Sequence, residues 1–172
     1  MKTKKNILII GAGLCGSLLA LRLGQRGYKV QVIEKRPDIR QSNLSTGRSI
    51  NLALSNRGLK ALQMVGLEDK VRSISIPMYG RMLHDKIGNK KMSKYSGRNG
   101  EYINSISREL LTSLLIDEAE LINNVNFEFN QNCWDIDFEN NIAYFKNDKN
   151  NRTTEFKADL IFGTDGAGSI LR

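Results

Sequence analysis

The chain opens with the pattern of a strand, a helix and a second strand. Residues 6–10 form a nearly continuous apolar run that stops at a glycine, which is typical of a strand buried on both faces of a parallel sheet. Leucines then recur at helical spacing from Leu14 to Leu23, and Gly27 lies where a helix would end. Residues 29–34 are rich in β-branched side chains. These patterns predict a β-α-β unit.

The later segments predict further strands and helices. Residues 38–46 are polar and predict a loop. Residues 49–55 alternate as a strand whose second face is small and polar, and Ser55 can cap a helix that runs to about Val65. The other predicted elements are a hairpin over 82–95, a helix over 107–122, a strand around 127–129, a hairpin over 134–145 and a buried strand over 158–162.

A glycine-rich turn separates the first predicted strand from the first helix. Its glycines, Gly11, Gly13 and Gly16, fit the G-x-G-x-x-G pattern. The first would allow a tight turn, the second a close approach of pyrophosphate, and the third close packing of helix on strand. Glu34 follows about 20 residues later, as expected for a carboxylate that accepts hydrogen bonds from ribose hydroxyls. Because a helix N-terminus favours phosphate, the pattern predicts a dinucleotide site.

The residues after this turn narrow the choice of dinucleotide. Glu34 would repel a 2′-phosphate, which disfavours NADP here and leaves NAD or the ADP half of FAD. Lys35 and Arg36 either flank the adenosine or are plain surface charge. The polar loop that follows departs from the regular β-α-β units of a nicotinamide dehydrogenase. Residues 163–169 follow a predicted strand, and Asp165 among them could hold sugar hydroxyls.

Composition excludes several other classes of function. The formal net charge is +8, but the basic residues are spread along the chain, and the densest stretch, 86–98, lacks the aromatic spacing of a base-stacking platform. We therefore expect a solvated surface and no nucleic-acid partner. Cys15 and Cys133 are far apart and His84 is the single histidine, so no zinc, iron–sulfur or two-histidine metal site is expected.

The cellular setting is also constrained. No apolar run approaches the ~18 residues of a membrane span. The apolar stretch near the N-terminus is too short for a signal peptide. Two thiols without a secretion signal suit a reducing compartment, so we expect a cytoplasmic protein.

The order of the motifs is more specific than any one of them. The glycine turn, Glu34, a Ser-x-Ser-Arg-x-x-Leu segment at 105–111 and G-x-D-G-A-x-S at 163–169 together resemble the single-component FAD-dependent aromatic hydroxylases. Residues 47–55 and 76–82 further resemble the members of that family that hydroxylate L-kynurenine. The resemblance covers essentially the whole chain. It implies an α/β fold, in which residues 1–172 are the N-terminal part of a Rossmann-like FAD-binding domain with part of an interleaved β-rich substrate region.

The resemblance also implies roles for individual residues. The hairpin region 75–105 would contribute to the substrate side. There Arg81 and Tyr95 match the pair that holds the amino-acid carboxylate of the substrate, although without the resemblance they would be a solvated charge and a packing aromatic. Cys15 would act through its backbone N–H, and Cys133 would pack rather than react. The implied FAD contacts are Gly11, Gly13, Cys15, Gly16, Glu34, Lys35, Arg36, Ala53, Arg108, Cys133 and Asp165.

The implied reaction needs no catalytic side chain and no metal. NADPH would reduce FAD, the reduced flavin and O2 would form a C4a-hydroperoxide, and the distal oxygen would convert L-kynurenine to 3-hydroxykynurenine. Members of the family are much longer than 172 residues, so we expect this chain alone to be inactive and to self-associate through uncovered apolar surface. Two alternatives stay open: an NAD-dependent dehydrogenase, supported by Glu34, and a non-catalytic FAD-binding remnant.

Overall fold

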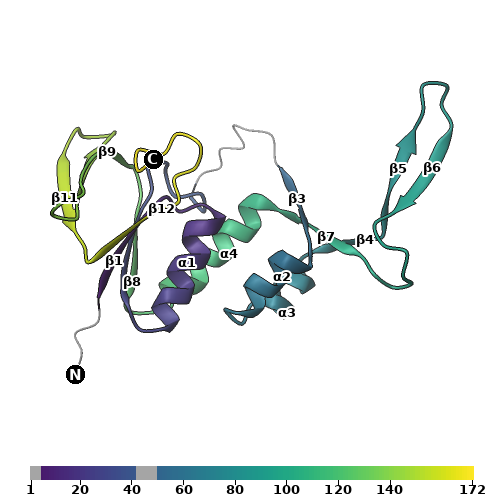
Figure 1. The fold of residues 1–172 in the computed structure, drawn as a ribbon, viewed down its shortest axis with the longest axis horizontal. Helices are drawn as coiled ribbons and strands as arrows, with labels where there is room; N and C mark the ends of the chain where they lie inside the picture. Colours follow the sequence, from purple (N-terminus) through teal and green to yellow (C-terminus); the bar gives the residue numbers. More distant parts are fainter. Residues whose placement is uncertain (1–4, 42–49) are drawn as a thin grey trace. The chain divides into compact units, whose positions relative to one another are not determined.

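The computed structural model describes residues 5–41 and 50–172. The chain divides into two compact units, one made of residues 1–48 and 109–172 and the other of residues 49–108. Figure 1 shows the elements of both. None of the helices within the described residues is long and apolar enough to cross a membrane.

A four-stranded parallel sheet forms the centre of the first unit (Figure 1). Its order is β12-β1-β2-β8, so β1 lies between β12 and β2. The helix α1 connects β1 to β2, which confirms the predicted β-α-β unit. The bounds are β1 Asn6–Ile10, α1 Leu14–Gln25, β2 Lys29–Ile33, β8 Val125–Glu128 and β12 Leu160–Gly163.

The two central strands of the parallel sheet, β1 and β2, are buried on both faces by different elements. Alternate side chains of β1 and β2, namely Leu8, Ile10 and Ile33, join one hydrophobic cluster with Ala143 and Phe145. Those two partners come from an antiparallel sheet of order β11-β10-β9. The opposite face of the parallel sheet packs against α1. The remaining elements of this unit are α4 Arg108–Glu120, β9 Gln131–Asp137, β10 Ile142–Asn147 and β11 Thr153–Lys157. Arg108, the first residue of α4, is assigned to the other unit.

The second unit contains a small antiparallel sheet, a hairpin and two short helices. The sheet has the order β3-β7-β4, and β5 and β6 form a separate two-stranded ribbon. This ribbon confirms the hairpin predicted around Gly88. The bounds are β3 Asn51–Leu54, α2 Asn56–Gln63, α3 Glu68–Ser73, β4 Ile76–Met78, β5 Gly80–His84, β6 Lys90–Lys94 and β7 Ile103–Ser107.

Some expectations from the sequence were wrong. Ser55 does lie at the N-cap of α2, but its side chain makes no capping hydrogen bond, and the helix ends at Gln63 rather than Val65. The strand β12 is not buried, since Leu160 is 42% exposed. It lies at an edge of the sheet and pairs with β1 alone among the described strands. The elements α3, β4, β7 and β11 were not predicted. Residues 42–49, which include most of the polar segment and Ser49, lie outside the described residues.

Candidate cofactor site

At two of its positions, the glycine turn between β1 and α1 leaves no room for a side chain. Gly11 has a φ of 103°, and a Cβ atom added to it would lie 2.7 Å from the carbonyl oxygen of Thr164. A Cβ atom on Gly16 would lie 1.9 Å from the carbonyl oxygen of Gly11. Real Cβ atoms do not approach backbone this closely, so both positions require glycine. Within the turn, Gly16 therefore packs against Gly11, and Gly11 packs against the loop that follows β12.

Gly13 differs from these two glycines because the space beside it is open. No described atom lies within 4 Å of a Cβ atom added there. Gly13 is the N-cap of α1 and makes no side-chain capping hydrogen bond, and Cys15 in the first turn is exposed. The first-turn N–H groups and the positive end of the helix dipole thus face a space that a phosphate group could enter.

Glu34 lies directly after β2 and is 6% exposed. Its Oε2 accepts a hydrogen bond from the Ala12 N–H at 2.8 Å, and its Oε1 accepts from the backbone N–H and the Nε of Arg36 at 3.0 and 2.9 Å. Burial acts to raise the pKa of Glu34, but the hydrogen bonds from Arg36 and Ala12 outweigh it and hold the pKa below its usual range. The carboxylate therefore stays charged, and Oε2 keeps a lone pair for a ribose hydroxyl.

The loop after β12 is tied to the glycine turn by Thr164. The backbone N–H of Thr164 donates to the Ile10 carbonyl at 2.8 Å, and its hydroxyl lies 2.9 and 2.7 Å from the carbonyl oxygens of Ile10 and Gly11. Sequence reasoning missed this residue, although it lies inside the 163–169 motif. Thr164 brings two motifs together that are far apart along the chain.

The next residue, Asp165, has one carboxylate oxygen without a partner in the described chain. Its Oδ1 is buried and accepts no hydrogen bond, whereas Oδ2 accepts from the Ile170 N–H at 3.2 Å. Burial raises the pKa of the Cys133 thiol to about 11, and the negative charge of Asp165 acts in the same direction. The structure thus places Cys133 near Asp165, and the thiol stays protonated near neutral pH, as expected of a packing cysteine.

The other candidate residues are distributed over both units. Lys35 is exposed beside Arg36. Ala53 is exposed on β3 opposite Ser105, and Arg108 donates its backbone N–H to the Ile50 carbonyl at 3.1 Å. Contacts of Lys35, Ala53 and Arg108 with the cofactor stay predictions.

The predicted substrate pair lies on the ribbon of the second unit. Arg81 pairs with Ser93 across β5 and β6, and the Tyr95 N–H donates to the Tyr79 carbonyl at 3.1 Å. Arg81 therefore lies within the ribbon, whereas Tyr95 directly follows β6, which ends at Lys94.

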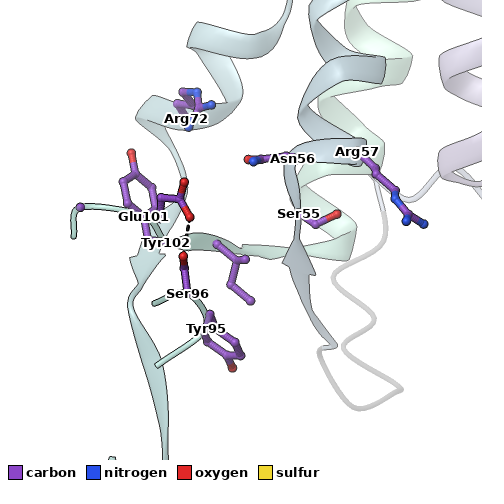
Figure 2. Close-up of a pocket in the computed structure, with 10 residues that line it drawn as sticks. Ser55, Asn56, Arg57, Arg72, Tyr95, Ser96, Glu101 and Tyr102 are labelled. Carbon is purple, nitrogen blue, oxygen red and sulfur yellow. Dashed lines mark hydrogen bonds between the residues drawn. The ribbon is translucent and has the colours of Figure 1, made fainter. Parts of the chain in front are cut away.

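Tyr95 also lines a pocket of about 460 Å³ within the second unit (Figure 2). Arg81 is not among the described residues that line this pocket. Most of the lining is polar, and Figure 2 shows the hydrogen bond that Ser96 donates to Glu101. Arg72, at one end of this view, forms an ion pair with Glu68 at 2.8 Å. The lining residues are Ser55, Asn56, Arg57, Arg72, Tyr95, Ser96, Gly100, Glu101, Tyr102 and Ile103.

The residues of the first unit fit a dinucleotide with a diphosphate and hydroxyl groups. The open space at Gly13 suits a pyrophosphate, and Glu34 and the unpartnered Oδ1 of Asp165 can each accept a hydroxyl hydrogen bond. With the parallel sheet, these features define a dinucleotide-binding domain of the Rossmann type. The chain belongs to the FAD binding domain family, whose model matches residues 4–172. This confirms the predicted cofactor, FAD, and the predicted fold class.

Sequence comparison finds similar enzymes of one kind. Kynurenine 3-monooxygenase from Christiangramia forsetii is 43% identical over 172 residues, which are 100% of this chain and 38% of that enzyme. The enzyme of the same name from Anopheles gambiae is 42% identical over 167 residues, 97% of this chain and 34% of that enzyme. The chain therefore spans little more than a third of the length of these relatives.

Solved structures confirm the fold. A p-nitrophenol 4-monooxygenase from Pseudomonas putida matches with a TM-score of 0.80 at 20% identity, covering 100% of this chain and 43% of that chain. The tetrameric form of 2-methyl-3-hydroxypyridine-5-carboxylic acid oxygenase matches with a TM-score of 0.78 at 22% identity. This match covers 99% of this chain and 42% of that chain.

Proposed function

We propose that this chain is the FAD-binding part of a monooxygenase that hydroxylates L-kynurenine, with NADPH as reductant and O2 as oxidant. The observation that carries the proposal is the 43% identity to a kynurenine 3-monooxygenase along the complete chain. FAD, when bound, supplies the redox chemistry of the oxygen transfer. The chain itself holds and orients the cofactor and part of the substrate. The cytoplasmic location, the inactivity of the isolated chain, its self-association and the lack of a nucleic-acid partner stay predictions.

The first unit would hold FAD through three groups. The first-turn N–H groups of α1 at Gly13 would bind the pyrophosphate, Glu34 would accept a hydrogen bond from the ribose, and Asp165 would accept one through its unpartnered oxygen. Arg36 stabilises the charged form of Glu34 through Oε1, and Oε2, which accepts one hydrogen bond from Ala12, has the capacity to accept one more. None of these groups takes part in bond making; they fix the position of the cofactor.

The second unit would hold the substrate. A guanidinium fork on Arg81 pairs with an amino-acid carboxylate, and the Tyr95 hydroxyl adds a directional hydrogen bond. The Tyr95 N–H donates to the carbonyl of Tyr79, two residues before Arg81, and this closeness of the two backbones supports their acting together. Neither residue has to exchange a proton, because the aromatic ring, not the carboxylate, is the part that reacts.

A titration with FAD tests the proposal on the purified chain. We expect saturable binding, followed by visible absorbance and flavin fluorescence. Glu34→Ala is expected to weaken it at least about tenfold, because the ribose loses a charged acceptor. Glu139→Ala is the matched control, since Glu139 is an exposed turn residue. A folded chain that binds NADH in preference to FAD, or neither cofactor, would contradict the proposal.

A further inference from the structure

Arg40 joins three carboxylates that come from two segments of the first unit. Its Nε and Nη2 donate to Asp38 at 2.9 and 2.7 Å. Its Nη1 donates to the Oδ1 of Asp117 at 2.9 Å and to the Oε2 of Glu120 at 2.5 Å, both on α4. The guanidinium also lies 5.9 Å from the centre of the Phe129 ring. We call these four charged residues, Asp38, Arg40, Asp117 and Glu120, the Arg40 clasp.

The pair of Asp38 and Arg40 within the clasp is more than a surface ion pair, whereas the side chains of Asp117 and Glu120 are 58% and 37% exposed. The side chain of Asp38 is 8% exposed and that of Arg40 is 24% exposed. The hydrogen bond from Arg40 lowers the pKa of Asp38 against the effect of burial, so Arg40 stabilises the charged form of Asp38. Three carboxylates this close repel one another unless a cation lies between them. Removal of the guanidinium would therefore release the segment that carries Asp38 from α4.

That segment is the turn that directly follows Glu34. Arg36, two residues after Glu34, donates to its carboxylate, and its carbonyl accepts from the Asn130 N–H at 3.1 Å. The turn is thus attached at Arg36 to the start of the antiparallel sheet and at Arg40 to α4. Two attachments fix the backbone between them more closely than one.

We propose that Arg40 is a positioning residue for the adenosine side of FAD: it holds turn 35–41 so that Glu34 and Arg36 keep the geometry that binds the ribose. The inference rests on the proposed function. Arg40 lies outside the G-x-G-x-x-G turn, and no motif in the sequence marks it. A lysine would supply the charge but not the planar fork that reaches both Asp38 and α4.

Arg40→Gln tests the inference in two ways on the full chain. Without FAD, residue-resolved hydrogen exchange of the Arg36 and Asn130 amides is expected to speed up about tenfold, because the turn opens more often. With FAD, the Kd is expected to rise about tenfold, which corresponds to one misplaced charge-assisted hydrogen bond. Arg40→Lys is expected to recover part of both effects.

Two further variants separate positioning from folding. Arg40→Gln alone leaves the buried charge of Asp38 without its cation and is expected to lower the thermal midpoint of unfolding. In Asp38→Asn/Arg40→Gln that charge is gone, while side chain 38 can still accept from the backbone N–H of residue 40, as Asp38 does at 3.0 Å. The thermal midpoint is therefore expected to recover, while exchange stays fast and FAD binding stays weak. Arg98→Gln removes an exposed ion pair of the second unit, with Arg98 84% exposed, and is expected to leave exchange at Arg36 and Asn130 and FAD affinity unchanged.

Several results would overturn the inference. One is unchanged exchange at Arg36 and Asn130 in Arg40→Gln, and another is wild-type FAD affinity in the double variant. If the unsubstituted chain binds no FAD, the proposed function fails, while the exchange experiment without FAD still decides whether Arg40 holds the turn.

Discussion

Gly13 and Gly16 lie three residues apart, yet the structure assigns them different tasks. A Cβ atom at Gly16 would collide with the Gly11 carbonyl, whereas one at Gly13 would meet no described atom. We therefore expect Gly16→Ala to lower the free energy of unfolding by about 2 kcal/mol or more. Gly13→Ala should change it by less than about 1 kcal/mol and still raise the FAD Kd about tenfold, since the methyl group fills the space of the pyrophosphate. Urea unfolding and FAD titration of both variants would check this; equal stability losses would contradict it.

Glu34 also predicts a dependence of stability on pH. Its pKa in the folded chain is below the ordinary value of 4.5, whereas the unfolded chain binds the proton near that value. The resulting stability is present above pH 4.5 and is lost as pH falls through the lower folded pKa. In Glu34→Gln this part of the acid dependence is expected to disappear, so the loss of stability on acidification is shallower. Urea unfolding at neutral pH and below pH 4.5 would show it; parallel curves for both proteins would refute it.

At the scale of elements, the Thr164 hydroxyl adds to the backbone pairing that connects β12 to the glycine turn. Thr164 lies within 2.9 Å of the Ile10 and Gly11 carbonyl oxygens, and it follows an edge strand. Thr164→Val keeps the shape but leaves these carbonyls without that donor, so we expect a loss of about 1–2 kcal/mol in the free energy of unfolding. Thr164→Ser, which retains the hydroxyl, is expected to recover most of it. A valine variant as stable as the unsubstituted chain would show that the backbone pairing alone holds this connection.

At the scale of the whole molecule, the two units predict two separable functions. In the monooxygenase proposed above, Arg81→Ala is expected to raise the KM for L-kynurenine at least about tenfold, because the substrate carboxylate loses its guanidinium partner. FAD affinity should be unchanged, since Arg81 is not among the residues predicted to contact FAD, and Gly13, Glu34 and Asp165 lie in the first unit. Steady-state kinetics and FAD titration on the same preparations would measure both. Weakened FAD binding with an unchanged KM would mean that this division is wrong.

Sequence reasoning predicted the elements whose pattern is long and regular. The β-α-β unit, the helix α4 and both hairpins have clear periodicity, and the structure contains all of them. The strand β4 was missed because a segment of three residues carries too little pattern to separate strand from loop. The strand β7 was missed because its buried face carries the polar Asn104 beside Ile106, so no apolar alternation marks it. The burial of β12 was overestimated because an apolar run does not show whether a strand is central or at an edge.

The sequence by itself determined the glycine turn and Glu34, because their roles depend on spacings within one β-α-β unit. Short-range geometry of this kind is set by the local backbone, so motif spacing predicts it. Only the tertiary structure decided the roles of Thr164 and Arg40. Thr164 contacts a glycine 153 positions away and Arg40 an aspartate 77 positions away. Such partners meet only when the sheet and helices have packed, and no local pattern of charge or hydrophobicity specifies which side chains that packing brings together.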